Sequence, residues 1–134
     1  MAKLIRYCKL SEEHNGDNVF DVSRPNIFGN PYTHIKNKQT KALVKVKTRD
    51  EAIDRYGRYF DNMLRLDEDF RNEFEKAVEA CFKYDVVYFG CYCKLDERCH
   101  SDIIIEKVRK EAVKRMLNKI SEGLSKKTDS QEVS

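Results

Sequence analysis

The chain has 134 residues, a length that predicts a single domain with a hydrophobic core of its own. Its 26 basic and 23 acidic residues leave a net charge of only +3, which argues against nucleic-acid binding. No apolar run approaches the ~18 residues of a membrane span, and the N-terminus carries no apolar leader, so we expect a cytoplasmic protein with reduced cysteines and no membrane contact.

The first half of the chain predicts short strands joined by turns. Residues 3–8 are expected to form a first strand, and residues 19–22 a second one after a turn-rich stretch. Two prolines, a glycine and two asparagines then fall within residues 24–32, a composition that predicts an irregular loop. Residues 43–46 are compatible with a further short strand or an extended approach to the next element.

The second half predicts two helices, a buried strand and a final helix. Thr48 and Glu51 form a capping-box pattern before an apolar repeat of helical spacing, and a second helix is expected after Asp67. Residues 86–93 are apolar on both faces, as expected for a central strand with helices on each side. A long helix begins near Ser101. Its apolar stripe is expected to comprise Ile104, Ile105, Val108, Ala112, Met116 and Ile120.

This order of elements predicts an α/β or α+β domain in which helices pack on a small sheet. We expect that domain to span residues 1–124. The remaining residues, 125–134, are polar and almost free of aromatic side chains, which predicts a disordered tail.

Three of the five cysteines gather where the buried strand meets the final helix, and a histidine lies beside them. The first hypothesis is a metal site, because Cys91, Cys93, Cys99 and His100 make up a Cys₃His set that suits zinc. Their spacing departs from the usual pair of C-x₂₋₄-C knuckles, so the pattern leaves other interpretations open.

Two further interpretations of this cluster need no metal. Cys99 is a candidate activated thiolate and His100 a candidate acid or base, and the start of the helix around Ser101 and Asp102 would favour an anion. Alternatively the cysteines are small apolar core residues, which explains the strand positions better than it explains the Cys99-His100 pair.

The loop over residues 24–32 is a second candidate for binding. Arg24 offers a planar group for a carboxylate or phosphate, Gly29 permits close approach of the backbone, and Asn30 offers an amide. The alternative is that the loop only turns a corner, with Phe28 and Tyr32 filling the core beneath it.

Taken together, three spaced motifs resemble the domain-of-unknown-function 4326 family over about residues 19 to 110. The resemblance implies a Rossmann-like α/β fold, a pocket where the first and third motifs meet, and, by association, a phage or prophage origin and a place in the host cytoplasm. It implies no reaction. The motifs are Arg24-Pro25 with Gly29-Asn30-Pro31-Tyr32, then Arg49-Asp50-Glu51-Ala52-Ile53-Asp54-Arg55-Tyr56, then Cys91-Tyr92-Cys93 with Cys99-His100-Ser101-Asp102.

We therefore expect an accessory protein that binds a small anionic or nucleotide-like ligand where the loop and the final helix start converge. Arg24 and Asn30 would orient the ligand, and the helix-start N–H groups from His100 to Asp102 would hold its charge. His100, Asp102 or Cys99 would carry any hydrolase or transferase step. The alternative is a zinc-stabilised interaction module that binds a host protein.

Overall fold

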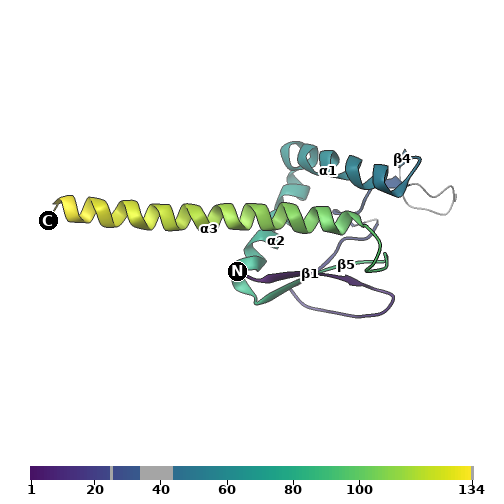
Figure 1. Cartoon of the computed structure of the whole chain (residues 1–134), viewed down its shortest axis with the longest axis horizontal. Coiled ribbons are helices and arrows are strands. Elements are labelled where there is room, and N and C mark those ends of the chain that lie inside the picture. Colours follow the sequence, from purple (N-terminus) through teal and green to yellow (C-terminus); the bar gives the residue numbers. More distant parts are fainter. Residues whose placement is uncertain (25, 34–43, 134) are drawn as a thin grey trace.

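The computed structural model describes residues 1–24, 26–33 and 44–133, and within them a small parallel sheet has three helices packed on it (Figure 1). In that sheet, β5 (Val86–Cys91) lies between β1 (Lys3–Cys8) and β2 (Val19–Asp21), and both neighbours run parallel to it. A short parallel pair is formed separately by β3 (Tyr32–Thr33) and β4 (Val44–Lys45). The predicted α/β fold is confirmed.

The helices are α1 (Arg49–Leu66), α2 (Glu68–Lys83) and α3 (His100–Val133), and two of their predicted boundaries are confirmed. The hydroxyl of Thr48 accepts the N–H of Glu51 and so caps α1. Asp67 ends α1 and begins α2, where its carboxylate accepts the N–H of Phe70 at 2.9 Å. In the described part of the chain, no helix is both long and apolar enough to cross a membrane.

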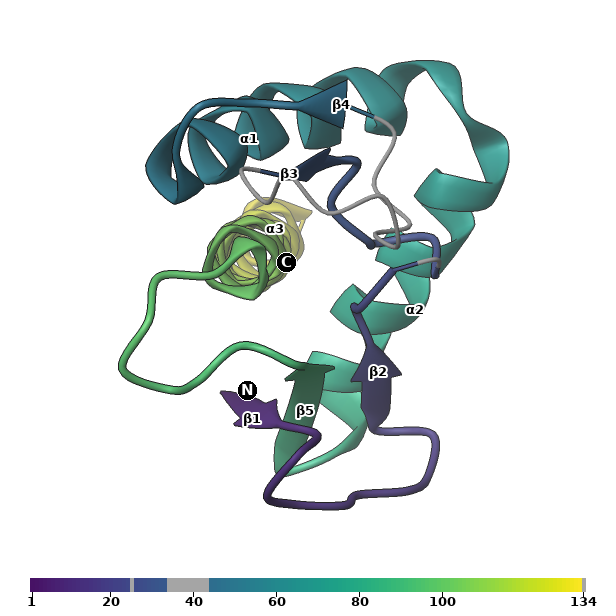
Figure 2. The same cartoon turned by 90° about the vertical axis from the view of Figure 1, so that its right-hand side faces the viewer.

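The three helices lie on one face of the sheet (Figure 2). Val87, Phe89 and Cys91 of β5 belong to the same buried cluster as the apolar side chains of all three helices. The expectation of helices on both faces is therefore wrong. On the opposite face the ring of Tyr88 stacks on His14 at 4.0 Å, so aromatic side chains and the turn between β1 and β2 cover it instead.

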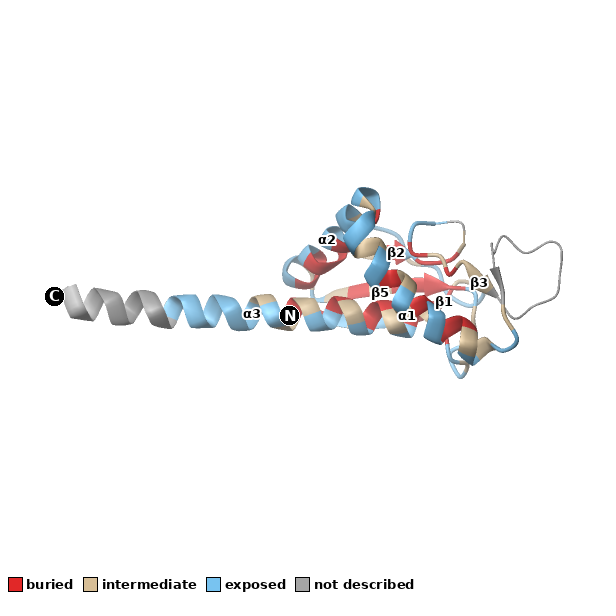
Figure 3. Cartoon of the chain, turned by 90° about the horizontal axis from the view of Figure 1, so that it is seen from above, coloured by how far each residue is buried: buried red, intermediate tan, exposed pale blue. Residues whose placement is uncertain are grey.

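Helix α3 extends beyond the sheet and the other two helices (Figure 1). Its inner half is buried as predicted, with Ile104 and Val108 inaccessible to solvent. Two members of the expected apolar stripe, Met116 and Ile120, are instead 37% and 55% exposed, and Figure 3 colours residues 116–123 as exposed. The backbone is helical up to Val133, which differs from the expected tail. Disorder of residues 125–134 in solution stays a prediction.

Because all three strands of the main sheet are parallel, their carboxyl ends meet at one edge. The chain leaves β1 at Lys9 and Leu10, leaves β5 at Tyr92, and leaves β2 toward Arg24. At the same edge, α3 begins at His100. The topology thus brings together the loop and the cysteine-rich segment that the sequence marks as candidates.

Candidate functional site

A cavity of about 460 Å³ opens at the carboxyl edge of the sheet, within the ~300–1,000 Å³ range of small-molecule sites. The loop after β2 and the start of α3 converge on it, as predicted from the sequence. Both Arg24 and His100 line it. The other lining residues are Leu10, Ser23, Asn30, Tyr32, Arg49, Ala52, Ile53, Cys91, Tyr92, Cys93, Lys94, Glu97, Arg98 and Cys99.

The loop after β2 is held by hydrogen bonds between its own residues. The Nη1 of Arg24 donates to the backbone oxygens of Asn30 at 2.9 Å and Tyr32 at 3.1 Å. The buried amide of Asn30 donates to the carbonyl of Ala52 in α1 at 3.2 Å. A Cβ at Gly29 would lie 2.9 Å from the Cα of Arg24, so this glycine allows close backbone packing inside the loop.

Not every predicted loop residue reaches the cavity. Asn30 lines it beside Arg24, but Gly29 does not, and Pro25 lies outside the described residues. Phe28 is almost fully buried and packs against aromatic rings of α1 and α2. The loop therefore lines the cavity through Arg24 and Asn30 and also fills the core through Phe28.

Arg24 carries a charge that the described carboxylates do not neutralise. Its guanidinium is half-buried, and its described hydrogen-bond acceptors are both neutral carbonyls. Burial lowers the pKa of Arg24, although the nearby thiols of Cys93 and Cys99 oppose that shift. By contrast, Arg49 pairs with Glu97 at 2.7 Å. Among the described residues the guanidinium of Arg24 therefore has no carboxylate partner, and the sulfur atoms of Cys93 and Cys99, when ionised, are what offsets its charge.

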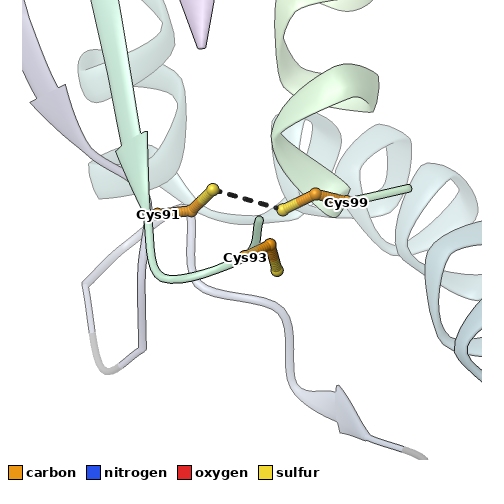
Figure 4. A group of neighbouring side chains, drawn as sticks. All are labelled: Cys91, Cys93 and Cys99. Atoms are coloured by element: carbon orange, nitrogen blue, oxygen red, sulfur yellow. Dashed lines mark hydrogen bonds between the residues drawn. The ribbon is translucent and has the colours of Figure 1, made fainter. Parts of the chain in front are cut away.

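The three cysteines of the cluster line the cavity, and Figure 4 shows their side chains gathered between the end of β5 and the start of α3. The sulfur atoms of Cys91, Cys93 and Cys99 all lie within 4.8 Å of one another. The thiol of Cys99 points at the sulfur of Cys91, 3.5 Å away. Strand β5 ends at Cys91, so Cys93 belongs to the following loop and not to the strand, yet its sulfur stays in the cluster.

The three thiols differ in their acidity. Hydrogen bonds from Cys91 and Cys99, and then from the guanidinium of Arg49 at 3.6 Å, hold the pKa of Cys93 far below its usual range. Hydrogen bonding within the cluster and burial raise the pKa of Cys99 well above that range. The contact with Arg49 thus favours the thiolate form at Cys93, the half-buried member of the cluster.

The ring of His100 is fixed on both sides. Its Nε2 lies 2.5 Å from the carbonyl of Val22, which accepts a hydrogen bond and therefore assigns the proton to Nε2. Its Nδ1 is left with a lone pair, 3.5 Å from the sulfur of Cys99. Burial lowers the pKa of His100, so the imidazole is neutral at pH 7.

The helix start differs from the anion site that the sequence predicts. The carboxylate of Asp102 accepts the N–H of Cys99 at 3.2 Å and pairs with Arg6 at 2.9 Å. It therefore supplies the negative charge that this end of α3 favours. Ser101 is fully buried against Cys91, and neither Ser101 nor Asp102 lines the cavity.

Sequence reasoning gave no role at the cavity to Arg49, which lines it, or to Arg6, which holds the adjacent loop. Arg49 was named only as the start of the second motif, but as the first residue of α1 it reaches across to Cys93 and Glu97. Arg6 donates to the carbonyls of Lys94 and Glu97 and so holds the loop after β5. The one available signal was the position of Arg49 directly after the helix cap.

A family model described as Domain of unknown function (DUF4326) matches residues 6–110, and the chain therefore belongs to that family. This confirms the resemblance drawn from the three motifs. No curated protein and no solved structure matches the chain.

Proposed function

We propose that this member of the DUF4326 family binds a small anionic ligand in the cavity at the carboxyl edge of its sheet. The observation that carries the proposal is the half-buried guanidinium of Arg24, which meets only neutral acceptors among the described residues. A half-buried cation without a carboxylate partner is unfavourable, and a bound anion would lower the penalty that the sulfur atoms of Cys93 and Cys99 offset only from a distance. A phosphate or carboxylate also matches the planar donor geometry of arginine.

The other arginines that line the cavity are already paired with carboxylates, which favours Arg24 as the residue that binds the anion. Arg49 is paired with Glu97, and Arg98 is paired with Asp50 and Asp54. The helix start is occupied by Asp102, so the expected contact of a ligand with its N–H groups gives way to contact with Arg24. Asn30 lies beside Arg24 in the lining and remains a candidate for orienting the ligand.

A reaction on that ligand is a further prediction, of hydrolase or transferase type. Within the lining, His100 holds a neutral ring with a lone pair on Nδ1 that faces the thiol of Cys99, which is the form required of a general base. Asp102 would act only by positioning, because Arg6 and the N–H of Cys99 hold its carboxylate outside the lining.

The anion site can be tested by calorimetric titration of the full chain with inorganic phosphate and with pyrophosphate. We expect saturable binding that weakens at least about tenfold in Arg24→Gln, the loss typical of a charged hydrogen-bonded contact. Arg58→Gln is the matched control, because Arg58 is an exposed residue of α1 that does not line the cavity.

The variant Arg24→Lys distinguishes a loss of ligand binding from a folding defect. It keeps the charge and loses the planar donors, so its affinity should fall between those of the wild type and Arg24→Gln. Absence of phosphate and pyrophosphate binding to the wild type would refute the anion site. So would equal affinities in Arg24→Gln and the wild type.

The cysteine cluster favours a second candidate function, a zinc-stabilised interaction module whose partner is a host protein. Three sulfur atoms within 4.8 Å of one another and the Nδ1 lone pair of His100 provide the donor types of a structural zinc site. The Nε2 proton donates to the carbonyl of Val22, which is the outer contact that orients many zinc-binding histidines. Zinc would here bind the thiolates and tie the loop after β5 to α3.

Metal analysis of the purified full chain tests this candidate. We expect about one zinc per chain, loss of the metal in Cys93→Ala, and a lower melting temperature after chelation. Cys81→Ala is the matched control, since Cys81 is a buried thiol of α2 outside the cluster. A zinc-free chain whose melting temperature is unaffected by added zinc or by chelator would exclude the module.

A further inference from the structure

The two ends of the cavity differ in chemistry. Along the sheet edge the strand order is β1, β5, β2, so Leu10 after β1 and Tyr92 after β5 precede Arg24 after β2. The N–H of Lys9 donates to the carbonyl of Cys91 at 2.8 Å, which keeps the segments after β1 and β5 side by side. One end of the cavity is therefore apolar and aromatic, and the other end carries the guanidinium of Arg24.

The two side chains at the apolar end of the cavity are exposed to solvent. Tyr92 is 54% exposed and Leu10 is 76% exposed, yet both line the cavity. Single exposed apolar side chains are ordinary on protein surfaces, but two that border one concave site offer a ligand apolar area to cover. At the cationic end the aromatic lining residue is Tyr32, which is less exposed than Tyr92.

One face of the Tyr92 ring is already in use. The ammonium of Lys9 lies over the ring, 4.8 Å from its centre. Tyr92 lines both this cavity and a neighbouring one, whereas Lys9 lines only the neighbouring one. The contact with Lys9 therefore holds the ring from the neighbouring side, and the face toward the main cavity is left for a ligand.

We infer that the ligand of this cavity joins an aromatic ring to its anionic group, as a nucleoside monophosphate does, and that the ring stacks on Tyr92. The inference rests on the proposed anion site at Arg24 and adds the substrate class. A phosphate alone would fill only a small part of about 460 Å³ and would leave the apolar end wet. A flat ring covers Tyr92 with little loss of side-chain freedom, because the ring is already held by Lys9.

The experiment compares three classes of probe by calorimetric titration of the full chain. They are the 5′-monophosphates of adenosine, guanosine, cytidine and uridine, then ribose 5-phosphate, and then inorganic phosphate. We expect at least one nucleoside monophosphate to bind about tenfold more tightly than ribose 5-phosphate, the gain typical of base stacking on an aromatic side chain.

Variants of Tyr92 test the stacking contact itself. Tyr92→Ala should bring the nucleotide to within about twofold of ribose 5-phosphate and leave ribose 5-phosphate binding unchanged, and Tyr92→Phe should keep the preference. Tyr92 is exposed, so its removal spares the core. Leu95→Ala is the matched control, because Leu95 is an exposed apolar neighbour in the same loop that does not line the cavity.

The outcomes separate this inference from the anion site. If ribose 5-phosphate and every nucleotide bind with equal affinity and all depend on Arg24, the anion site stands and the ring contact is refuted. A nucleotide preference that survives in Tyr92→Ala also refutes it. If none of the probes binds, the anion site fails and the ring contact fails with it.

Discussion

Asp21 connects the sheet to the loop that carries Arg24. Its carboxylate accepts hydrogen bonds from the N–H and the hydroxyl of Ser23, and it pairs with the ammonium of Lys9. Burial alone would raise the pKa of Asp21, but the hydrogen bonds from Lys9 and Ser23 outweigh it and hold that pKa below its ordinary value. The ionised carboxylate therefore stabilises the last turn before the cavity.

Replacement of Asp21 by asparagine should lower the stability of the protein in a pH-dependent way. Because the pKa of Asp21 is lower in the folded chain than in the unfolded one, its contribution is present above about pH 4 and is lost as the pH falls through the folded value. We expect Asp21→Asn to reduce the free energy of unfolding by up to about 1 kcal/mol at pH 7, since the side chain is partly exposed.

Urea denaturation at pH 7 and at pH 3 measures this difference. The penalty should shrink at the lower pH, and Asp17→Asn, which removes an exposed carboxylate from the preceding turn, should cause little change at either pH. An equal penalty for Asp21→Asn at both pH values would mean that the charge of the carboxylate plays no part.

At this scale the sequence predicted which residue types gather but not how they pair. Cys99 and His100 were expected at the cavity because they lie where the chain passes from the last strand to the final helix, and both line it. Cys99 was the candidate thiolate, and nothing in the sequence indicates that Arg49, from another element, contacts the sulfur of Cys93. Contacts between residues this far apart in the chain leave no local pattern.

At the scale of elements, boundaries with a local chemical cause were predicted well. The strand over residues 3–8 and the helix starts at Thr48 and Asp67 are confirmed, because a short strand-forming run and side-chain caps are properties of neighbouring residues. The covering of the sheet was predicted wrongly. Tyr88 looks apolar in the sequence, and only the fold reveals that His14 covers it in place of a helix.

The N-terminal cap of α1 stabilises the helix whose first residue, Arg49, lines the cavity. Thr48 accepts the N–H of Glu51 at 3.1 Å, and the carboxylate of Glu51 accepts the N–H of Lys47 in return. We expect Thr48→Ala to reduce the free energy of unfolding by about 1 kcal/mol in urea denaturation, and Thr48→Ser to restore most of it. An alanine variant as stable as the wild type would show that the cap is dispensable.

At the scale of the whole molecule, α3 changes role along its length. Its first turns contact the sheet and the other helices, and its outer half runs past them (Figure 3). A regular apolar spacing predicted one continuous buried stripe, but periodicity gives only the face of a helix and not the distance over which a partner accompanies it. Ala112 is the last buried residue in the part of α3 whose exposure is described. Side chains of α2 still contact α3 beyond it, Glu75 at Arg115 and Phe82 at Lys119.

Two isoleucines of α3 allow the difference in burial between its inner and outer parts to be measured. Ile104 is inaccessible to solvent, so Ile104→Ala should reduce the free energy of unfolding by about 2–5 kcal/mol through lost burial and a cavity. Ile120 is 55% exposed, so Ile120→Ala should change it by less than about 0.5 kcal/mol. The same substitution on the same helix controls for helix propensity.

A comparable loss at Ile120, measured by urea denaturation at several protein concentrations, would mean that the outer half of α3 is covered in solution. Concentration dependence of that loss would assign the cover to a second copy of the chain.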